Sequence, residues 1–138
     1  MDNLYFDDNK EYTNYSNKRI LVVDDNKLNL KVALRFMEKY QFQTDEAYSG
    51  EECIEKVKSG EHYDIIFMDI MMPTMSGVEA FHELQKIEGF SIPVIIALTA
   101  DAVEGAREKY LNEGFAEYIS KPIVREHLDE VIHKVLDK

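Results

Sequence analysis

The sequence has a single cysteine, no tryptophan and no apolar run near the roughly 18 residues that a membrane-spanning helix needs. Cys53 alone cannot form an internal disulfide, which is compatible with a reducing cytosol. Residues 1–16 also lack the basic start and apolar core of a secretory signal. We therefore expect a cytoplasmic chain without membrane insertion.

Positive charge is scarce as well. The 16 lysines and arginines face 27 aspartates and glutamates, which gives a formal net charge of -11. Such a chain repels phosphate backbones and anionic membrane surfaces, so direct nucleic-acid binding is not expected. Internal repeats and low-complexity segments are absent, and 138 residues suit one ordinary domain with its own core.

Residues 1–17 are rich in Asn, Asp and Tyr and follow neither a helical nor a strand period. An abrupt change to apolar residues follows them. We therefore predict a disordered or linker tail over residues 1–17 and one folded domain over residues 18–138.

Beyond the tail, short apolar runs alternate with segments of helical period. The expected strands cover residues 20–23, 42–47, 63–68, 93–98 and 115–120. The expected helices cover residues 26–40, 49–60, 77–88, 101–114 and 124–135. Polar residues suited to cap a helix precede three of them, namely Asn26, Ser49 with Glu52, and Asp101 with Glu104. Val124 offers the last helix no polar cap.

Five strands alternating with five helices predict an α/β fold, a doubly wound five-stranded parallel sheet with helices on both faces. In such folds, ligands bind outside the carboxyl ends of the strands, where the strand order reverses. Residues at these strand ends are therefore the candidates for function.

Polar residues stand at four of the five strand ends: Asp24 and Asp25 after the first strand, Asp69 after the third, Thr99 after the fourth and Lys121 after the fifth. Neighbouring strands lie about 4.8 Å apart, so these side chains could converge on one small ligand. Three carboxylates that close repel each other unless a cation lies among them. Hard oxygen ligands favour Mg²⁺, and beside it Asp69 would be an ionised nucleophile for a phosphoryl group. Thr99 would supply a hydroxyl donor and Lys121 a compact positive charge.

The segments around these residues resemble the response regulator receiver domains, the CheY-like family. The matching segments are LVVDDN (residues 21–26), MDIMMPTMSG (68–77), ALTA (97–100) and YISKP (118–122). The resemblance covers residues 18–138. It implies a flavodoxin-like three-layer fold with the strand order 2-1-3-4-5.

The resemblance also implies a role for each residue. Asp69 would be the phospho-acceptor, and Mg²⁺ or Mn²⁺ would be bound by Asp24, Asp25, Asp69 and the carbonyl group of Met71. Thr99 and Lys121 would contact the phosphoryl group. Tyr118 would be an aromatic switch whose ring position follows Thr99, and the Lys121–Pro122 bond would be cis. Phosphorylation would then change the surface formed by helix 101–114, strand 115–120 and helix 124–135.

The implied phosphoryl donor is a histidine kinase or a histidine phosphotransfer protein. Leu28, Leu30 and Leu34 widen the apolar arc of helix 26–40 beyond what a surface helix needs. We predict that they help to dock the donor, together with Pro122; the alternative is a helix sunk deeper into the core. A phosphorylation-dependent homodimer is left open. Either a stand-alone regulator or the receiver of a larger protein is expected. The DDNKLNL segment (residues 24–30) favours the second, because it looks more like receivers attached to hybrid sensor histidine kinases.

Three other functions fit the sequence less well. An aspartate-nucleophile phosphatase needs a second carboxylate two residues after the nucleophile, where Met71 stands. A flavin or nucleotide carrier needs a Gly- or Thr-rich loop after the first strand, where Asp24 and Asp25 would repel a phosphate. A pseudo-receiver that only binds partners would not need the complete set of five residues. We therefore expect a signalling domain rather than an enzyme, with self-catalysed phosphorylation and slow autodephosphorylation.

Overall fold

The computed structural model describes residues 11–89, 93–100 and 103–137. Its strands are β1 (Arg19–Val23), β2 (Gln43–Ala47), β3 (Ile65–Asp69), β4 (Val94–Thr99) and β5 (Glu117–Ser120). Its helices are α1 (Lys27–Glu38), α2 (Gly50–Lys58), α3 (Gly77–Gln85), α4 (Ala106–Glu113) and α5 (Arg125–Leu136). The strands pair in parallel in the order β2-β1-β3-β4-β5, which confirms the predicted fold.

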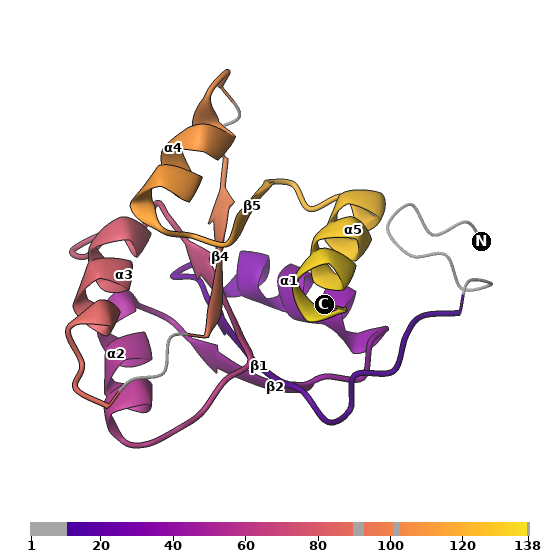
Figure 1. The fold of residues 1–138 in the computed structure, drawn as a ribbon, viewed down its shortest axis with the longest axis horizontal. Coiled ribbons are helices and arrows are strands. Elements are labelled where there is room, and N and C mark those ends of the chain that lie inside the picture. Colours follow the sequence, from indigo (N-terminus) through magenta and orange to yellow (C-terminus); the bar gives the residue numbers. More distant parts are fainter. Residues whose placement is uncertain (1–10, 90–92, 101–102, 138) are drawn as a thin grey trace.

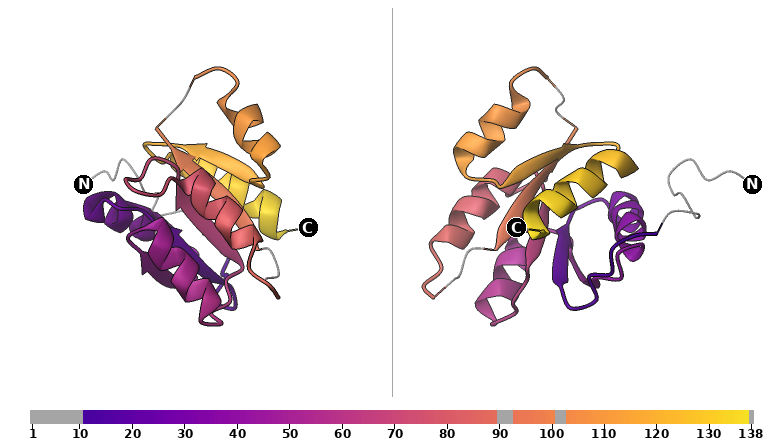
Figure 2. Two further views of the ribbon diagram at one scale, coloured as in Figure 1. Left: turned by 90° about the vertical axis from the view of Figure 1, so that its left-hand side faces the viewer. Right: turned by 45° about the vertical axis from the view of Figure 1, so that its right-hand side comes forward.

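The helices cover the sheet from both sides, as Figure 1 shows. Apolar residues of α1 and α5 pack with Ile20, Val22 and Phe67 on one face of the sheet. Apolar residues of α2, α3 and α4 pack with Leu21 and Ile66 on the other. Figure 2 shows the same three layers from two further directions. All five residues of β3 are buried, as expected of the central strand of a parallel sheet.

The helix starts follow the predicted caps with one exception. The side chain of Asn26 accepts a hydrogen bond from the Asn29 amide, and that of Ser49 accepts one from Glu52. Val124 precedes α5 without a side-chain cap, as predicted. The fourth helix, however, was predicted to begin at Asp101, which lies outside the described residues. It begins at Ala106, because Gly105 with φ of 86° ends the preceding turn.

The described part of the N-terminal segment differs from the predicted tail. Tyr15 is buried in the core between the sheet and α5, and Tyr12 packs against the same cluster. The folded part therefore begins upstream of the predicted boundary at residue 18. Within the described ranges, no helix is long and apolar enough to cross a membrane.

Candidate functional site

The predicted site residues meet at the carboxyl edge of the sheet. Asp24 directly follows β1, Asp69 and Thr99 are the last residues of β3 and β4, and Lys121 directly follows β5. The parallel register places Asp69 beside Leu98 and Thr99 beside Ser120. Because every strand points the same way, the strand ends bring these side chains together although they are far apart in sequence.

The three carboxylates form one cluster. Carboxylate oxygens of Asp24, Asp25 and Asp69 all lie within 4.8 Å of one another. Asp24 and Asp69 are 2% and 3% exposed, whereas Asp25 lies at the surface. An oxygen-rich cluster that is open on one side suits a hard divalent cation that keeps several water ligands. The donor set therefore fits Mg²⁺ or Mn²⁺.

Lys121 brings a positive charge to this cluster. Its Nζ lies 2.8 Å from Asp24 Oδ2 and 3.2 Å from Asp69 Oδ1. Burial alone would lower the pKa of Lys121, but the ion pairs with the two aspartates outweigh it and raise the pKa. Lys121 is therefore fully protonated at neutral pH and linked to the predicted acceptor. The Lys121–Pro122 bond is cis, as predicted.

The environment of Asp69 resists its ionisation. Burial raises the pKa of its carboxyl group above the usual range and the nearby Asp24 adds to this, while Lys121 and the Met71 amide oppose it. The Met71 amide donates to Asp69 Oδ1 at 3.2 Å. A cation at the cluster would favour the ionised carboxylate, which is the nucleophilic form.

Thr99 ends β4, and Tyr118 lies on the neighbouring strand β5. Thr99 is fully buried, and its carbonyl group accepts a hydrogen bond of 2.8 Å from the Lys121 amide. The half-buried Tyr118 stacks on Tyr110 of α4, with ring centroids 6.3 Å apart and an interplanar angle of 27°. A movement of the Tyr118 ring therefore alters its contact with α4.

The predicted docking residues divide into exposed and buried ones. Leu28 is 70% exposed and Pro122 is exposed, so both are accessible to a partner. Leu30 is 1% exposed and belongs to the core, so its predicted docking role is wrong. Leu34 is partly buried and packs against the same core. For Leu30, the alternative of a helix sunk into the core is the correct one, whereas docking through Leu34 stays a prediction.

Three further apolar residues are exposed although the prediction did not assign them to docking. Val32 on α1 is 45% exposed, Met71 in the loop after β3 is 71% exposed and Val124 before α5 is 52% exposed. Met71 comes two residues after Asp69, and Val124 comes three residues after Lys121. A sequence shows that a residue is apolar but not whether the core covers it, so only the structure identifies them.

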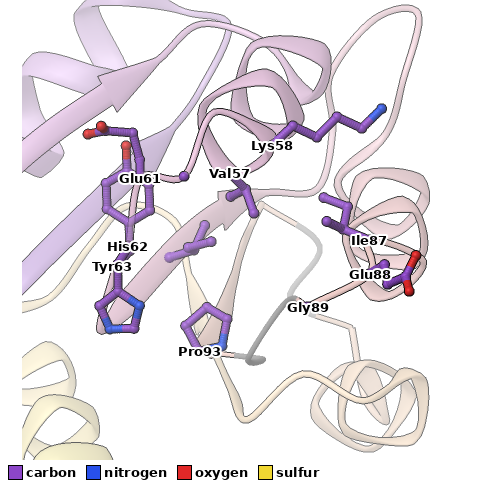
Figure 3. Close-up of a pocket in the computed structure, with 11 residues that line it drawn as sticks. Val57, Lys58, Glu61, His62, Tyr63, Ile87, Glu88, Gly89 and Pro93 are labelled. Atoms are coloured by element: carbon purple, nitrogen blue, oxygen red, sulfur yellow. The ribbon is translucent and has the colours of Figure 1, made fainter.

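A separate cavity of about 290 Å³ opens at the opposite edge of the sheet, next to the start of β3. Figure 3 shows Val57, His62, Tyr63, Ile87 and Pro93 around it. None of the residues that line this cavity belongs to the predicted site.

Comparison with known proteins agrees with this arrangement. A family model described as the response regulator receiver domain matches residues 20–133. Histidine protein kinase 1 of Candida albicans is 38% identical over 127 residues, which cover 85% of the chain and 5% of the kinase. The autoinducer 2 sensor kinase/phosphatase LuxQ of Vibrio vulnificus is 37% identical over 117 residues, which cover 83% of the chain and 13% of the kinase. The chain thus spans only a small part of these relatives.

Solved structures of similar fold include three receiver domains. That of the sensor histidine kinase PA1611 of Pseudomonas aeruginosa carries a magnesium ion in its active site cleft (29% identity, TM-score 0.77, 88% of this chain and 98% of that chain). The receiver domain of CKI1 of Arabidopsis thaliana is complexed with Mg²⁺ and BeF₃⁻ (31% identity, TM-score 0.74, 88% of this chain and 91% of that chain). The receiver domain of Ssk1 of Saccharomyces cerevisiae is bound to the histidine phosphotransfer protein Ypd1 (28% identity, TM-score 0.73, 85% of this chain and 87% of that chain).

Proposed function

The chain belongs to the response regulator receiver domains of two-component signalling systems, and on this basis we propose that Asp69 is its phospho-acceptor. One observation carries the proposal: the Asp69 carboxylate lies within 4.8 Å of those of Asp24 and Asp25 and 3.2 Å from Lys121 Nζ. Phosphoryl transfer depends mainly on positioning and charge stabilisation, and this cluster supplies both.

The proposed reaction moves a phosphoryl group from a phosphohistidine to Asp69. A carboxylate oxygen of Asp69 attacks the phosphorus atom, the bond between phosphorus and the imidazole nitrogen breaks, and the imidazole leaves with the electron pair. Lys121 lies where its ammonium group can bind a phosphoryl oxygen, and the Thr99 hydroxyl is a second donor to that group. Slow hydrolysis of the aspartyl phosphate returns the domain to its starting state.

A divalent cation would be held by the carboxylates of Asp24, Asp25 and Asp69 and by the Met71 carbonyl group. When bound, Mg²⁺ or Mn²⁺ supplies charge neutralisation between the acidic cluster and the phosphoryl oxygens. The carboxylate cluster supports this assignment, as do the magnesium-bound receiver domains of PA1611 and CKI1.

We propose that phosphorylation acts on the rest of the domain through Thr99 and Tyr118. Thr99 adjoins the acceptor strand, and the Tyr118 ring stacks on Tyr110 of α4. Movement of these two residues would alter the surface formed by α4, β5 and α5. A phosphorylation-dependent homodimer and a cytoplasmic location stay predictions.

We propose a histidine kinase or a histidine phosphotransfer protein as the donor. Its docking surface would consist of five exposed apolar residues on α1 and in the segments after β3 and β5, namely Leu28, Val32, Met71, Pro122 and Val124. An apolar rim around a charged centre excludes water from the transferring group. The complex of Ssk1 with Ypd1 supports a partner of this kind.

Intact mass spectrometry tests the acceptor. With Mg²⁺ and acetyl phosphate or phosphoramidate, we expect the protein to gain one phosphoryl group, and Asp69→Asn or EDTA to prevent the gain. Glu38→Gln, an exposed carboxylate on α1, is a matched control that should be modified like the parent. An unmodified parent would favour a pseudo-receiver, and a modified Asp69→Asn would place the acceptor elsewhere.

Transfer kinetics test the docking surface. We expect Leu28→Ala and Met71→Ala to slow transfer from a phosphorylated donor protein about tenfold while leaving modification by acetyl phosphate unchanged. Lys31→Ala, another exposed residue of α1, is the control. Equal rates in Leu28→Ala, Met71→Ala and the parent would exclude docking at these residues. Leu30→Ala would test packing instead, because Leu30 is buried.

A further inference from the structure

Residues 12–18, here called the strap, are hydrogen-bonded into the domain alongside the connection between α1 and β2. The Tyr15 amide donates to the Tyr40 carbonyl group at 2.8 Å, and the Gln43 amide donates to the Lys18 carbonyl group at 3.0 Å. The Gln43 side chain also donates to the Ser16 carbonyl group at 2.9 Å. Satisfied backbone groups of this kind define one conformation for the strap.

The Tyr15 side chain reaches from this connection to the end of α5. Its ring is 6% exposed and stacks on Phe42, with centroids 5.4 Å apart and planes 7° from parallel. Its Oη donates to Asp137 Oδ1 at 2.8 Å and lies 3.3 Å from His133 Nδ1. Burial, followed by the bond to Asp137, raises the pKa of Tyr15 to about 12, so its hydroxyl group stays a donor throughout the physiological range.

Tyr12 joins the strap to the start of α5. Its ring meets Tyr40 edge-on at 5.4 Å, and Cζ of Arg125 lies 5.0 Å from its centroid. The same guanidinium group lies 4.7 Å from the ring of Phe36 on α1. Because Arg125 is the first residue of α5 and Asp137 directly follows the last, the strap contacts both ends of that helix.

Asp137 gives the strap contact an electrostatic basis. A negative charge at the C-terminal end of a helix is unfavourable, because the helix dipole is negative there. Asp137 stands at the C-cap of α5, where it is bonded by His133 and by Tyr15, and both bonds lower its pKa. The strap thus supplies one of the two side-chain hydrogen bonds to this carboxylate. This chemistry suits a contact that stabilises the last turn of α5.

We propose that the surface formed by Tyr40, Phe42, His133 and Asp137 is the binding site for the chain's own strap, and that the strap couples α5 to the connection between α1 and β2. Stabilisation runs in both directions: strap binding orders the last turn of α5, and a displacement of α5 loosens the strap. Figure 1 shows the indigo segment that contains the strap on the α1 and α5 side of the sheet. The receiver domain thereby extends upstream of residue 18.

Hydrogen exchange on the full 138-residue protein tests the contact. Tyr15→Phe keeps the stacked ring and removes the hydroxyl contacts with Asp137 and His133, so we expect residues 130–137 to exchange about three- to tenfold faster while residues 40–43 are unchanged. Tyr15→Ala should accelerate exchange in both segments. The matched control is Tyr48→Phe, which removes an exposed hydroxyl bond of 2.7 Å to Glu46 and should leave both segments unchanged. If Tyr15→Phe leaves residues 130–137 unchanged, Tyr15 does not hold α5.

A second experiment, which rests on the proposed function, tests the coupling. Mg²⁺ and BeF₃⁻ are added to the parent protein, and binding is followed by ¹⁹F NMR while strap exchange is measured. We expect binding together with a change of at least about twofold in exchange of the Tyr15 amide. Binding without a change in the strap overturns the coupling alone. If BeF₃⁻ does not bind, the proposed role of Asp69 as phospho-acceptor is contradicted. The exchange rates of the Tyr15 variants then test the strap contact by themselves.

Discussion

Lys121 Nζ lies 2.8 Å from Asp24 Oδ2, so the lysine after β5 neutralises the buried carboxylate after β1. A divalent cation held by the same carboxylate must share it with this ammonium group. Lys121 thus has two opposite effects on the site. It weakens binding of the cation and strengthens binding of the phosphoryl group.

These effects are separable by Lys121→Met. We expect the variant to bind Mg²⁺ at least about threefold more tightly, because the positive charge of Lys121 that repels the cation is removed. We also expect its phosphorylation by acetyl phosphate to slow by about 100-fold, because a stabilising cation is lost. Calorimetry measures the first and intact mass the second. Lys86→Met, an exposed lysine on the connection after α3, is the control and should change neither. Weaker Mg²⁺ binding in Lys121→Met would contradict the competition.

Asp25→Asn separates cation binding from stability. Asp25 is exposed and lies within 4.8 Å of two other carboxylates. Its negative charge therefore favours cation binding but destabilises the folded protein when no cation is bound. We expect Mg²⁺ affinity to fall about tenfold or more, while the urea midpoint without Mg²⁺ does not fall. Glu38→Gln is again the control. A drop in the midpoint without Mg²⁺ would show that Asp25 has a structural role.

Gly77 is the residue that allows the loop after Asp69 to close. A Cβ atom at this position would lie 2.3 Å from the Asp69 carbonyl oxygen and 2.9 Å from Ile70 Cα, both of them backbone atoms. We expect Gly77→Ala to lower the free energy of unfolding by about 3 kcal/mol, measured by urea denaturation.

Gly50→Ala is the matched control, since Gly50 and Gly77 are both the first residue of a helix that follows a serine cap. A Cβ atom at Gly50 would meet side-chain atoms, the nearest being Met75 Sδ at 3.0 Å. Met75 can move, and alanine favours the helix by about 1 kcal/mol, so we expect a net change of less than about 1 kcal/mol. Equal losses in the two variants would contradict the backbone clash.

The site was predictable because it depends on local sequence alone. A short apolar run marks each strand, the residue after it marks the carboxyl end, and parallel strands bring those ends together. Asp24, Asp69, Thr99 and Lys121 follow this logic and lie where it places them.

The failures concern residues whose environment is set by distant parts of the chain. Leu28 and Leu30 are equally apolar, but Leu28 is exposed, whereas Leu30 is buried in the core cluster that also contains residues of α5. Tyr15 belongs to a polar segment without a period, and only Phe42 and Asp137 give it a place in the core. Glu117 has the appearance of a surface acid in the sequence and is 4% exposed.

Glu117 also predicts how the domain responds to acid. It accepts hydrogen bonds from Arg107 Nε of α4 at 2.9 Å and from Lys134 Nζ of α5 at 2.7 Å, so one carboxylate on β5 holds two helices. Burial alone would raise the pKa of Glu117, but these two partners lower it from the usual 4.5 to about 2. A pKa that is lower in the folded state stabilises the fold above pH 4.5, and this contribution is lost as the pH falls from 4.5 to about 2.

We therefore expect Glu117→Gln to cost about 2 kcal/mol at pH 7, because two charge-assisted bonds are weakened. The difference from the parent should persist down to about pH 5 and shrink as the pH falls towards 2, since the parent then loses the same charge. Urea denaturation at a series of pH values measures this. Glu83→Gln, which breaks an exposed pair with Lys86, should leave the free energy of unfolding nearly unchanged. A Glu117→Gln difference that stays constant between pH 7 and pH 2.5 would mean that packing, rather than charge, makes Glu117 important.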